Sequence, residues 1–282
     1  MPFAVETFDL TRTFGAQTAV DRLSLQVPEG SFYGFLGPNG AGKSTTINIL
    51  TGLLAPTSGR ASVLGYDVAG QDLEVKRRIG VVPDGLHLFE RLNGEEHLRF
   101  VGEIHGLPPA EARRRAHELL EAMDLAGSAR KQVSGYSHGM RKKLALSCAL
   151  IHEPRVLFLD EPFEGVDAIA TRELRELLQR LVSHRRVTVF LTSHVLEVVE
   201  RLCTHVGIIA KGALVASGSL DELRRGADGG TRTLEELFLD KVGAQRADVG
   251  AGLDWLTGGP AAAAPPETGA AGAPGAGPGT GA

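Results

Sequence analysis

Short apolar runs alternate with amphipathic stretches along the chain up to about residue 242. The runs at residues 31–36, 156–159 and 187–192 are too short for helices and are typical of strands buried in a parallel sheet. Two further sets of apolar residues recur at the spacing of one buried helix face: Leu174, Leu177, Leu178, Leu181 and Val195, Val198, Val199, Leu202. This alternation predicts an α/β domain.

Strand patterns disappear over about residues 85–153, where helical patterns dominate. This change predicts a helical subdomain inserted into a sheet-based core. Further along, two apolar runs at residues 206–210 and 213–217 flank Lys211 and Gly212. A short glycine-containing link between two such runs predicts a β-hairpin.

The composition changes after residue 242. Residues 243–282 are dominated by Ala, Gly and Pro, whose side chains offer too little area to offset the entropy of ordering the chain. We therefore expect a domain over residues 1–242 followed by a disordered tail over residues 243–282. Trp255 lies in this tail, where incidental local contact is favoured over a role in docking another protein.

The strongest chemical signal is a glycine-rich segment between a predicted strand and a predicted helix at residues 45–50. It reads Gly37, Pro38, Asn39, Gly40, Ala41, Gly42, Lys43, Ser44, and Thr45 follows it. Glycines let backbone N–H groups converge on phosphate oxygens, and the following helix adds its positive N-terminal end. In such a loop Lys43 reaches the β- and γ-phosphates and the Ser44 hydroxyl helps to hold Mg²⁺. The segment predicts binding of a nucleoside triphosphate.

Two adjacent carboxylates follow the predicted strand at residues 156–159. Asp160 is suited to ligating Mg²⁺ through water, and Glu161 to polarising the water that attacks the γ-phosphate. An isolated Asp-Glu pair is usually a polar loop, but the phosphate loop makes the catalytic interpretation stronger. His194 follows the strand at residues 187–192 and is placed to donate a hydrogen bond to the γ-phosphate.

In this order the motifs resemble those of the ATP-binding subunits of ABC transporters, over about residues 3–242. The resemblance implies ATP and Mg²⁺ as cofactors and a RecA-like phosphate-loop NTPase core with an antiparallel β subdomain and an inserted helical subdomain. The family's signature, close to Leu-Ser-Gly-Gly-Gln, corresponds here to Tyr136, Ser137, His138, Gly139, Met140. A helix is predicted after it at residues 144–151, and the resemblance implies that residues 137–140 face ATP held by a second subunit.

The resemblance extends to other positions. Phe14 matches the aromatic that stacks on adenine, and Asp167 matches the acid of a loop that touches the opposite subunit. Asp84 stands where the family usually carries a glutamine that senses Mg²⁺. As a shorter, charged side chain it would approach Mg²⁺ only through water and would repel uncompensated phosphate. Residues 88–98 resemble the surface for the membrane subunit and, with residues 233–239, are most similar to the exporter branch that handles drugs, antibiotics or cell-surface polymers.

Charge and hydropathy limit the partners. A net charge of -4 argues against a nucleic-acid binder. The chain carries no apolar run of about 18 residues and no signal-peptide pattern, so we expect a cytoplasmic protein. The resemblance places it on the inner face of the cell membrane beside a polytopic permease subunit. Each motif occurs once, so one chain holds half of two composite sites and we expect a homodimer that encloses two ATP molecules.

Three other functions are compatible with a phosphate loop. A soluble ABC ATPase acting on ribosomes is disfavoured, because such chains carry two of these domains and this chain carries a single set of motifs. A DNA-repair relative would need a long coiled-coil insertion, and no heptad run of that length occurs. A regulatory module that binds ATP without hydrolysing it stays open because of Asp84, although Glu161 and His194 argue against it.

Overall fold

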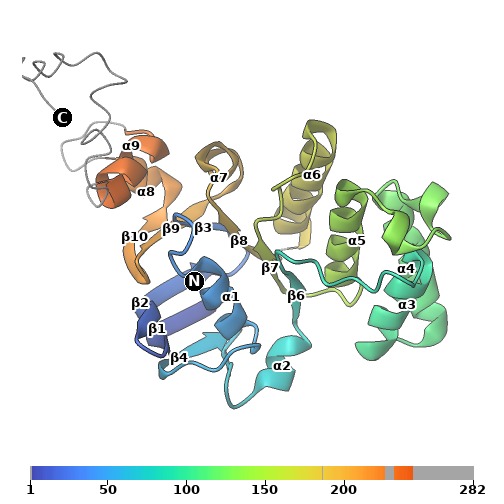
Figure 1. The fold of residues 1–282 in the computed structure, drawn as a ribbon, viewed down its shortest axis with the longest axis horizontal. Helices are drawn as coiled ribbons and strands as arrows, with labels where there is room; N and C mark the ends of the chain where they lie inside the picture. Colours follow the sequence, from blue (N-terminus) through green and yellow to red (C-terminus); the bar gives the residue numbers. More distant parts are fainter. Residues whose placement is uncertain (1, 186, 226–231, 244–282) are drawn as a thin grey trace, which may run out of the picture. The chain divides into compact units, whose positions relative to one another are not determined.

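Two β-sheets organise the chain in the computed structural model, which describes residues 2–185, 187–225 and 232–243 (Figure 1). The larger sheet has the strand order β10-β9-β3-β8-β7-β6. Its members are β3 (Phe32–Leu36), β6 (Ile79–Val82), β7 (Val156–Asp160), β8 (Thr188–Ser193), β9 (His205–Ala210) and β10 (Ala213–Ser219). Strand β10 pairs antiparallel with β9, and the other neighbours are parallel. The strands predicted at residues 31–36, 156–159 and 187–192 and the hairpin around Lys211 are confirmed.

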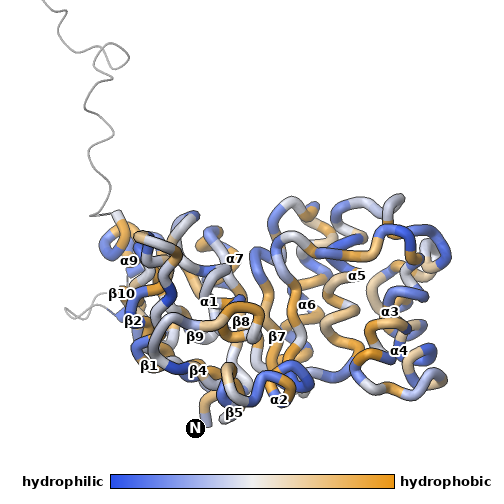
Figure 2. Tube along the Cα trace, turned by 60° about the horizontal axis from the view of Figure 1, so that its bottom comes forward, coloured by the Kyte–Doolittle hydropathy of each residue, from blue (hydrophilic) through white to orange (hydrophobic). Residues whose placement is uncertain are grey.

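The larger sheet is buried on both faces, which explains its continuous apolar runs. On one face, Tyr33, Phe35 and Phe190 pack with the smaller sheet and the first helix. On the other face, Phe32 and Leu36 pack with residues of the later helices. The rings of Tyr33 and Phe190 stack at 5.5 Å between centroids and 8° between planes. Figure 2 shows the hydrophobic colour concentrated along β7 and β8.

The helices surround and extend the larger sheet. They are α1 (Lys43–Leu50), α2 (Asp72–Lys76), α3 (Gly94–Ile104), α4 (Pro109–Ala122), α5 (His138–Leu150), α6 (Ala168–Arg185), α7 (Leu196–Leu202), α8 (Leu220–Arg224) and α9 (Leu234–Phe238). Short 3-10 turns occur at Ala126–Ser128 and Val133–Gly135, and a π-helical turn, Leu239–Gly243, follows α9. Val195 was expected on a buried face, but it is 42% exposed because α7 begins only at Leu196.

The smaller sheet is antiparallel, with the strand order β2-β1-β4-β5. Its strands are β1 (Phe3–Phe14), β2 (Gln17–Pro28), β4 (Ser58–Val63) and β5 (Tyr66–Asp67). No strand is predicted above within residues 3–28. The register of β1 against β2 shifts at several places, and Asp9 and Arg22 have positive φ. Such bulges interrupt the period of two on which strand prediction depends.

The segment between β6 and β7 is helical. It contains α3, α4 and α5, which lie together beyond the edge strand β6 (Figure 1), and its described residues form only one isolated bridge, Asn93 with Gln132. With the two sheets, this insertion confirms the predicted α/β fold class. The tail predicted for residues 243–282, including Trp255, lies outside the described residues except for Gly243.

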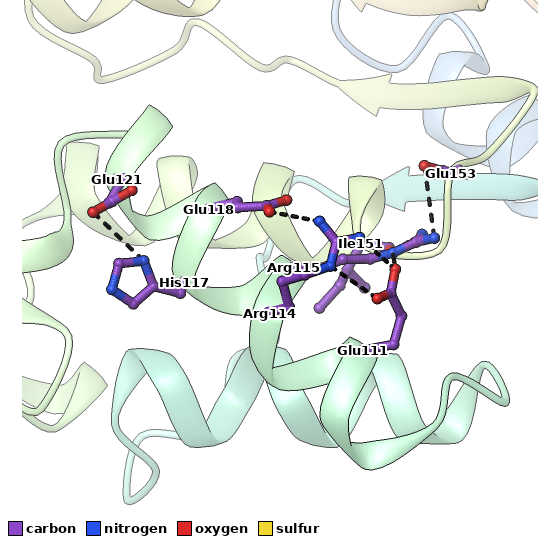
Figure 3. Close-up of polar contacts among 8 residues, drawn as sticks. All are labelled: Glu111, Arg114, Arg115, His117, Glu118, Glu121, Ile151 and Glu153. Atoms are coloured by element: carbon purple, nitrogen blue, oxygen red, sulfur yellow. Dashed lines mark hydrogen bonds and ion pairs between the residues drawn. The ribbon is translucent and has the colours of Figure 1, made fainter.

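An arginine cluster joins α4 to the loop that follows α5 (Figure 3). Arg114 pairs on its own helix with Glu111 and Glu118, as a solvated helix face would. Arg115 also pairs with Glu111, and in addition it donates to Ile151 O at 2.9 Å and lies 3.7 Å from Glu153. The helix α4 is therefore joined to the C-terminal end of α5 by a directed hydrogen bond as well as by apolar packing.

Two histidines stack where α3 ends and the sheet begins. The rings of His105 and His152 lie 3.7 Å apart at 8°, and His152 Nε2 donates to Ile79 O at 2.8 Å. Burial, with smaller effects of His105 and Arg115, lowers the pKa of His152 to about 4. The unfolded chain therefore binds a proton below about pH 6.5 that the folded chain does not bind. We expect the free energy of unfolding to fall by roughly 2–3 kcal/mol from this group as pH drops from 6.5 to 4.

This pH dependence can be checked by urea unfolding at pH 7 and pH 4.5. His152→Gln keeps an N–H donor for Ile79 O and removes the titrating group, so its stability should change less between the two pH values. His117→Gln is the matched control, since His117 is 73% exposed and pairs only with Glu121 of its own helix. An equal pH slope in wild type and His152→Gln would contradict the assignment.

Candidate active site

The candidate site lies at the carboxyl ends of four neighbouring strands. Strands β3, β8, β7 and β6 are adjacent and parallel, so their following loops meet at one edge of the sheet. The loop after β3 is the glycine-rich segment. His194 follows β8, Glu161 follows β7 and Asp84 lies two residues beyond β6. Residues far apart in the sequence are thus brought to one place by strand order.

The glycine-rich loop is closely packed by backbone. Gly42, the N-cap of α1, has φ 108°, and a Cβ there would clash with Ala19 O. A Cβ on Gly37 would lie 2.5 Å from Ile209 O. Only glycine fits these two positions. Lys43 is 6% exposed, and its Nζ donates to Gly37 O at 2.8 Å, so the ammonium lies against the loop that it would serve.

The Glu161 carboxylate lies between two predicted site residues. Its Oε1 is 3.4 Å from Lys43 Nζ, and its Oε2 is 3.2 Å from His194 Nδ1. Oε1 is buried and accepts no hydrogen bond from the described residues. The carboxylate is thus held between the ammonium of the phosphate loop and the His194 ring.

Thr192 connects the two neighbouring acids from the adjacent strand. Its hydroxyl donates to Asp160 Oδ1 at 2.5 Å and accepts from the Glu161 N–H at 3.0 Å. Thr192 is fully buried at the end of β8. One side chain therefore orients both the Asp160 carboxylate and the backbone of Glu161. The sequence gives no signal for this role, because Thr192 reads as an ordinary strand residue.

A pocket of about 550 Å³ gathers most of the predicted site residues. Its lining consists of Phe14, Gln17, Ala19, Pro38, Asn39, Gly40, Ala41, Gly42, Lys43, Ser44, Thr45, Asp84, Glu161, Glu164 and His194. Gly37 and Asp160 are not part of this lining. Gln17, Ala19 and Glu164 were not predicted as lining residues, and only the closeness of Glu164 to Glu161 in sequence could have indicated one of them.

Phe14 forms one end of the pocket. It is the last residue of β1 and 48% exposed, and the Arg12 guanidinium lies 4.6 Å from the centroid of its ring. Arg12 also donates to Ala55 O at 2.9 Å. An exposed ring supported in this way offers a surface on which a planar base can stack.

The signature residues lie outside this pocket. Ser137 is the N-cap of α5, and its hydroxyl accepts from the Met140 N–H at 3.2 Å. His138 Nε2 lies 3.4 Å from Glu164 O. Ser137, His138, Gly139 and Met140 therefore form a separate helix N-terminus on the same chain. Asp167 accepts from backbone N–H groups in the first turn of α6.

The oxygen donors near the phosphate loop fit Mg²⁺. The described residues contain no group of three or more His, Cys, Asp or Glu side chains that could hold a metal ion. Mg²⁺ commonly needs fewer protein ligands, since it keeps several waters and binds substrate phosphates. Ser44 and Asp84 line the pocket. Asp160 is 6% exposed, directly precedes the lining residue Glu161 in the chain, and has one oxygen engaged by Thr192.

Comparison with known proteins gives consistent matches. The family described as ABC transporter matches residues 20–164. Bacitracin transport ATP-binding protein BcrA of Bacillus licheniformis is 39% identical over 225 residues, which cover 80% of this chain and 72% of that protein. Daunorubicin resistance ATP-binding protein DrrA3 of Streptomyces coeruleorubidus is 42% identical over 76% of this chain and 67% of its own length. Linearmycin resistance ATP-binding protein LnrL of Bacillus subtilis (strain 168) is 37% identical over 78% and 71%.

Solved structures resemble the fold. The structure of an ATP-binding subunit of an ABC transporter superposes with a TM-score of 0.77 at 33% identity and covers 84% of this chain and 98% of that one. A dimeric ATP-binding cassette, MJ0796, in a post-hydrolysis state with ADP and Pi has a TM-score of 0.71 at 25% identity, covering 77% and 98%.

Proposed function

We propose that this chain, which belongs to the ABC transporter family, drives export of a small molecule through a separate membrane permease. The chain is an ATP-binding subunit, and its activity is ATP hydrolysis coupled to transport. The observation that carries the proposal is that the phosphate loop, Glu161 and His194 line the same pocket. The export direction is supported by the relatives named for bacitracin transport and for daunorubicin and linearmycin resistance.

The predicted site residues have the following proposed parts in the reaction. Phe14 stacks on adenine, and the backbone N–H groups of residues 37–45 with the Lys43 ammonium hold the phosphates. Glu161 accepts a proton from the attacking water, and His194 orients that water and the γ-phosphate. Ser44 and Asp160 would hold Mg²⁺, with Asp84 acting through water. Bound Mg²⁺ would neutralise charge that develops on the phosphate oxygens.

The separation of the signature from the pocket supports a two-chain site. Residues 137–140 cap α5 and do not line the pocket of their own chain. Their helix N-terminus suits a phosphate brought by another chain. We therefore propose a homodimer in which ATP lies between one chain's phosphate loop and the other's signature. Loss of the γ-phosphate bridge after hydrolysis would release the pair and shift the permease between conformations.

An exposed patch of apolar side chains in the helical insertion supports a contact surface for the permease. Phe89 is 55% exposed, Phe100 43% and Ile104 65%, and the Phe89 and Phe100 rings meet edge to face at 5.6 Å. Apolar side chains grouped on a surface mark protein contacts. Phe89 belongs to residues 88–98, the segment that resembles the family's surface for the membrane subunit. None of the helices among the described residues has the length and apolar character to cross a bilayer. We propose a peripheral position on the cytoplasmic face of the membrane.

Affinity purification from gently solubilised membranes tests this proposal. A tagged chain in its native cell should recover a polytopic membrane protein in stoichiometric amount. Phe89→Ala should lower that recovery, whereas Leu73→Ala, which removes an equally exposed apolar side chain on α2, should not. Reproducible recovery of the chain alone, or on ribosomes, would contradict the transporter role and favour a soluble ABC-type ATPase.

A further inference from the structure

A buried lysine on the signature helix contacts the catalytic strand of the same chain. Lys142 lies in the second turn of α5 and is 4% exposed. It lines a small cavity whose other lining residues are apolar, among them Leu146 and Leu159. Its Nζ donates to Glu161 O at 2.8 Å. Because a lysine is almost never buried without a partner, this contact calls for a specific reason.

The backbone that Lys142 contacts has an unfavourable conformation. Glu161 has φ 46°, in the left-handed region that residues with a Cβ seldom adopt. Three hydrogen bonds hold it there: Thr192 accepts from its N–H, and both the Lys142 ammonium and the Glu164 N–H donate to its carbonyl, the latter at 3.2 Å. This conformation directs the carboxylate toward Lys43 and His194. Lys142 is the one side chain among these partners that donates to the Glu161 carbonyl, so it contributes to the position of the carboxylate.

Lys142 also supplies a positive charge behind an acidic wall of the pocket. Asp84, Glu161 and Glu164 all line the pocket that would receive the triphosphate. Burial lowers the pKa of Lys142, and the carboxylates of Glu164, Asp84 and Glu161 act in the opposite direction. The ammonium thus lies in the field of acids from the loops after β6 and β7.

We propose that Lys142 is a positioning residue for ATP hydrolysis, holding the Glu161 backbone in its left-handed conformation and compensating the charge of Asp84. The inference rests on the role proposed above for Glu161. It has a consequence for coupling, because α5 begins directly after its N-cap Ser137 and carries Lys142 in its second turn. In the proposed dimer, the N-terminus of α5 would contact the ATP bound by the partner chain. The same helix, through Lys142, would hold Glu161, which acts on the ATP bound by its own chain.

Steady-state ATPase kinetics of the full chain test the proposal without a membrane partner. Lys142→Met keeps the apolar stem and removes the donor and the charge. We expect kcat to fall about tenfold or more and KM to rise several-fold, with an unchanged thermal unfolding midpoint. Lys142→Arg, which keeps a charged donor, should retain more of kcat. Lys143→Met is the matched control on the same helix, since Lys143 pairs with Glu173 of α6, and it should leave kcat within about twofold.

A double variant separates the two effects. Adding Asp84→Asn to Lys142→Met should return KM toward the wild-type value, because it removes the uncompensated charge, but should not restore kcat. A kcat for Lys142→Met within about twofold of wild type would overturn the proposal, as would recovery of kcat by Asp84→Asn. Failure to recover a permease would bear only on the transporter role. Hydrolysis by Glu161→Gln would remove Glu161 from catalysis and with it the premise of this inference, whereas a wild-type kcat in Lys142→Met would overturn the inference alone.

Discussion

Replacing Lys43 by alanine is expected to abolish tight ATP binding. The buried ammonium is held against the phosphate loop and is proposed to contact two phosphates. Each charge-assisted hydrogen bond contributes about 1.5–3 kcal/mol, so their joint loss should weaken ATP binding by about 100-fold or more. Equilibrium binding of a fluorescent ATP analogue, with competition by ATP, measures the change.

The Lys43 experiment needs a control for folding and for charge. Lys43→Ala also leaves the buried Glu161 carboxylate without its nearby cation, and Lys43→Met keeps more of the packing. Both variants should show native circular dichroism. Lys76→Ala removes an exposed lysine that pairs with Asp72 of its own helix, and its ATP affinity should match that of wild type. An unchanged dissociation constant in both Lys43 variants would contradict the phosphate-loop assignment.

Glu161→Gln is expected to retain ATP binding and to lose hydrolysis. The amide keeps the shape of the side chain but cannot accept a proton from water. General-base catalysis contributes about 100- to 10,000-fold, so phosphate release should fall by about 100-fold or more. Because the γ-phosphate then persists, the variant should accumulate as a closed dimer with excess Mg·ATP. Phosphate release and multi-angle light scattering measure the two effects.

Two different results would contradict this prediction. Robust hydrolysis by Glu161→Gln would remove Glu161 from the catalytic role. A monomer in excess Mg·ATP would contradict the two-chain site for the isolated subunit. Glu197→Gln is the control, because Glu197 is exposed on α7 and pairs with Arg201 on the same helix. It should hydrolyse ATP at the wild-type rate.

Much of the candidate site could be predicted from the sequence because its signals are local. A glycine-rich loop needs its glycines, its lysine and its hydroxyl within eight neighbouring positions, and Asp160 and Glu161 are adjacent at the end of one apolar run. Parallel strands end at one edge of a sheet, so the loops after β3, β7 and β8 had to converge if those strands were neighbours. The structure places Gly40, Lys43, Glu161 and His194 accordingly.

Contacts between distant segments could not be predicted in the same way. Lys142 stands in the sequence between Arg141 and Lys143 with no signal of its own, yet it is buried and donates to Glu161 O. Thr192 reads as a strand residue, yet it joins Asp160 and Glu161. These contacts depend on the placement of α5 and β8 beside β7, which no pattern within a single segment records.

By itself, the sequence determined the alternation of strands and helices, the helical insertion and the phosphate-binding loop. Each of these features is specified by residues that are close together in the chain, through hydrophobic periodicity and the conformational preferences of turn residues. Only the tertiary structure decided the register of β1 against β2, the exposure of Val195 and the fixing of Glu161 between Thr192 and Lys142. These follow from non-local pairing and packing, whose energy depends on neighbours that the local sequence does not specify.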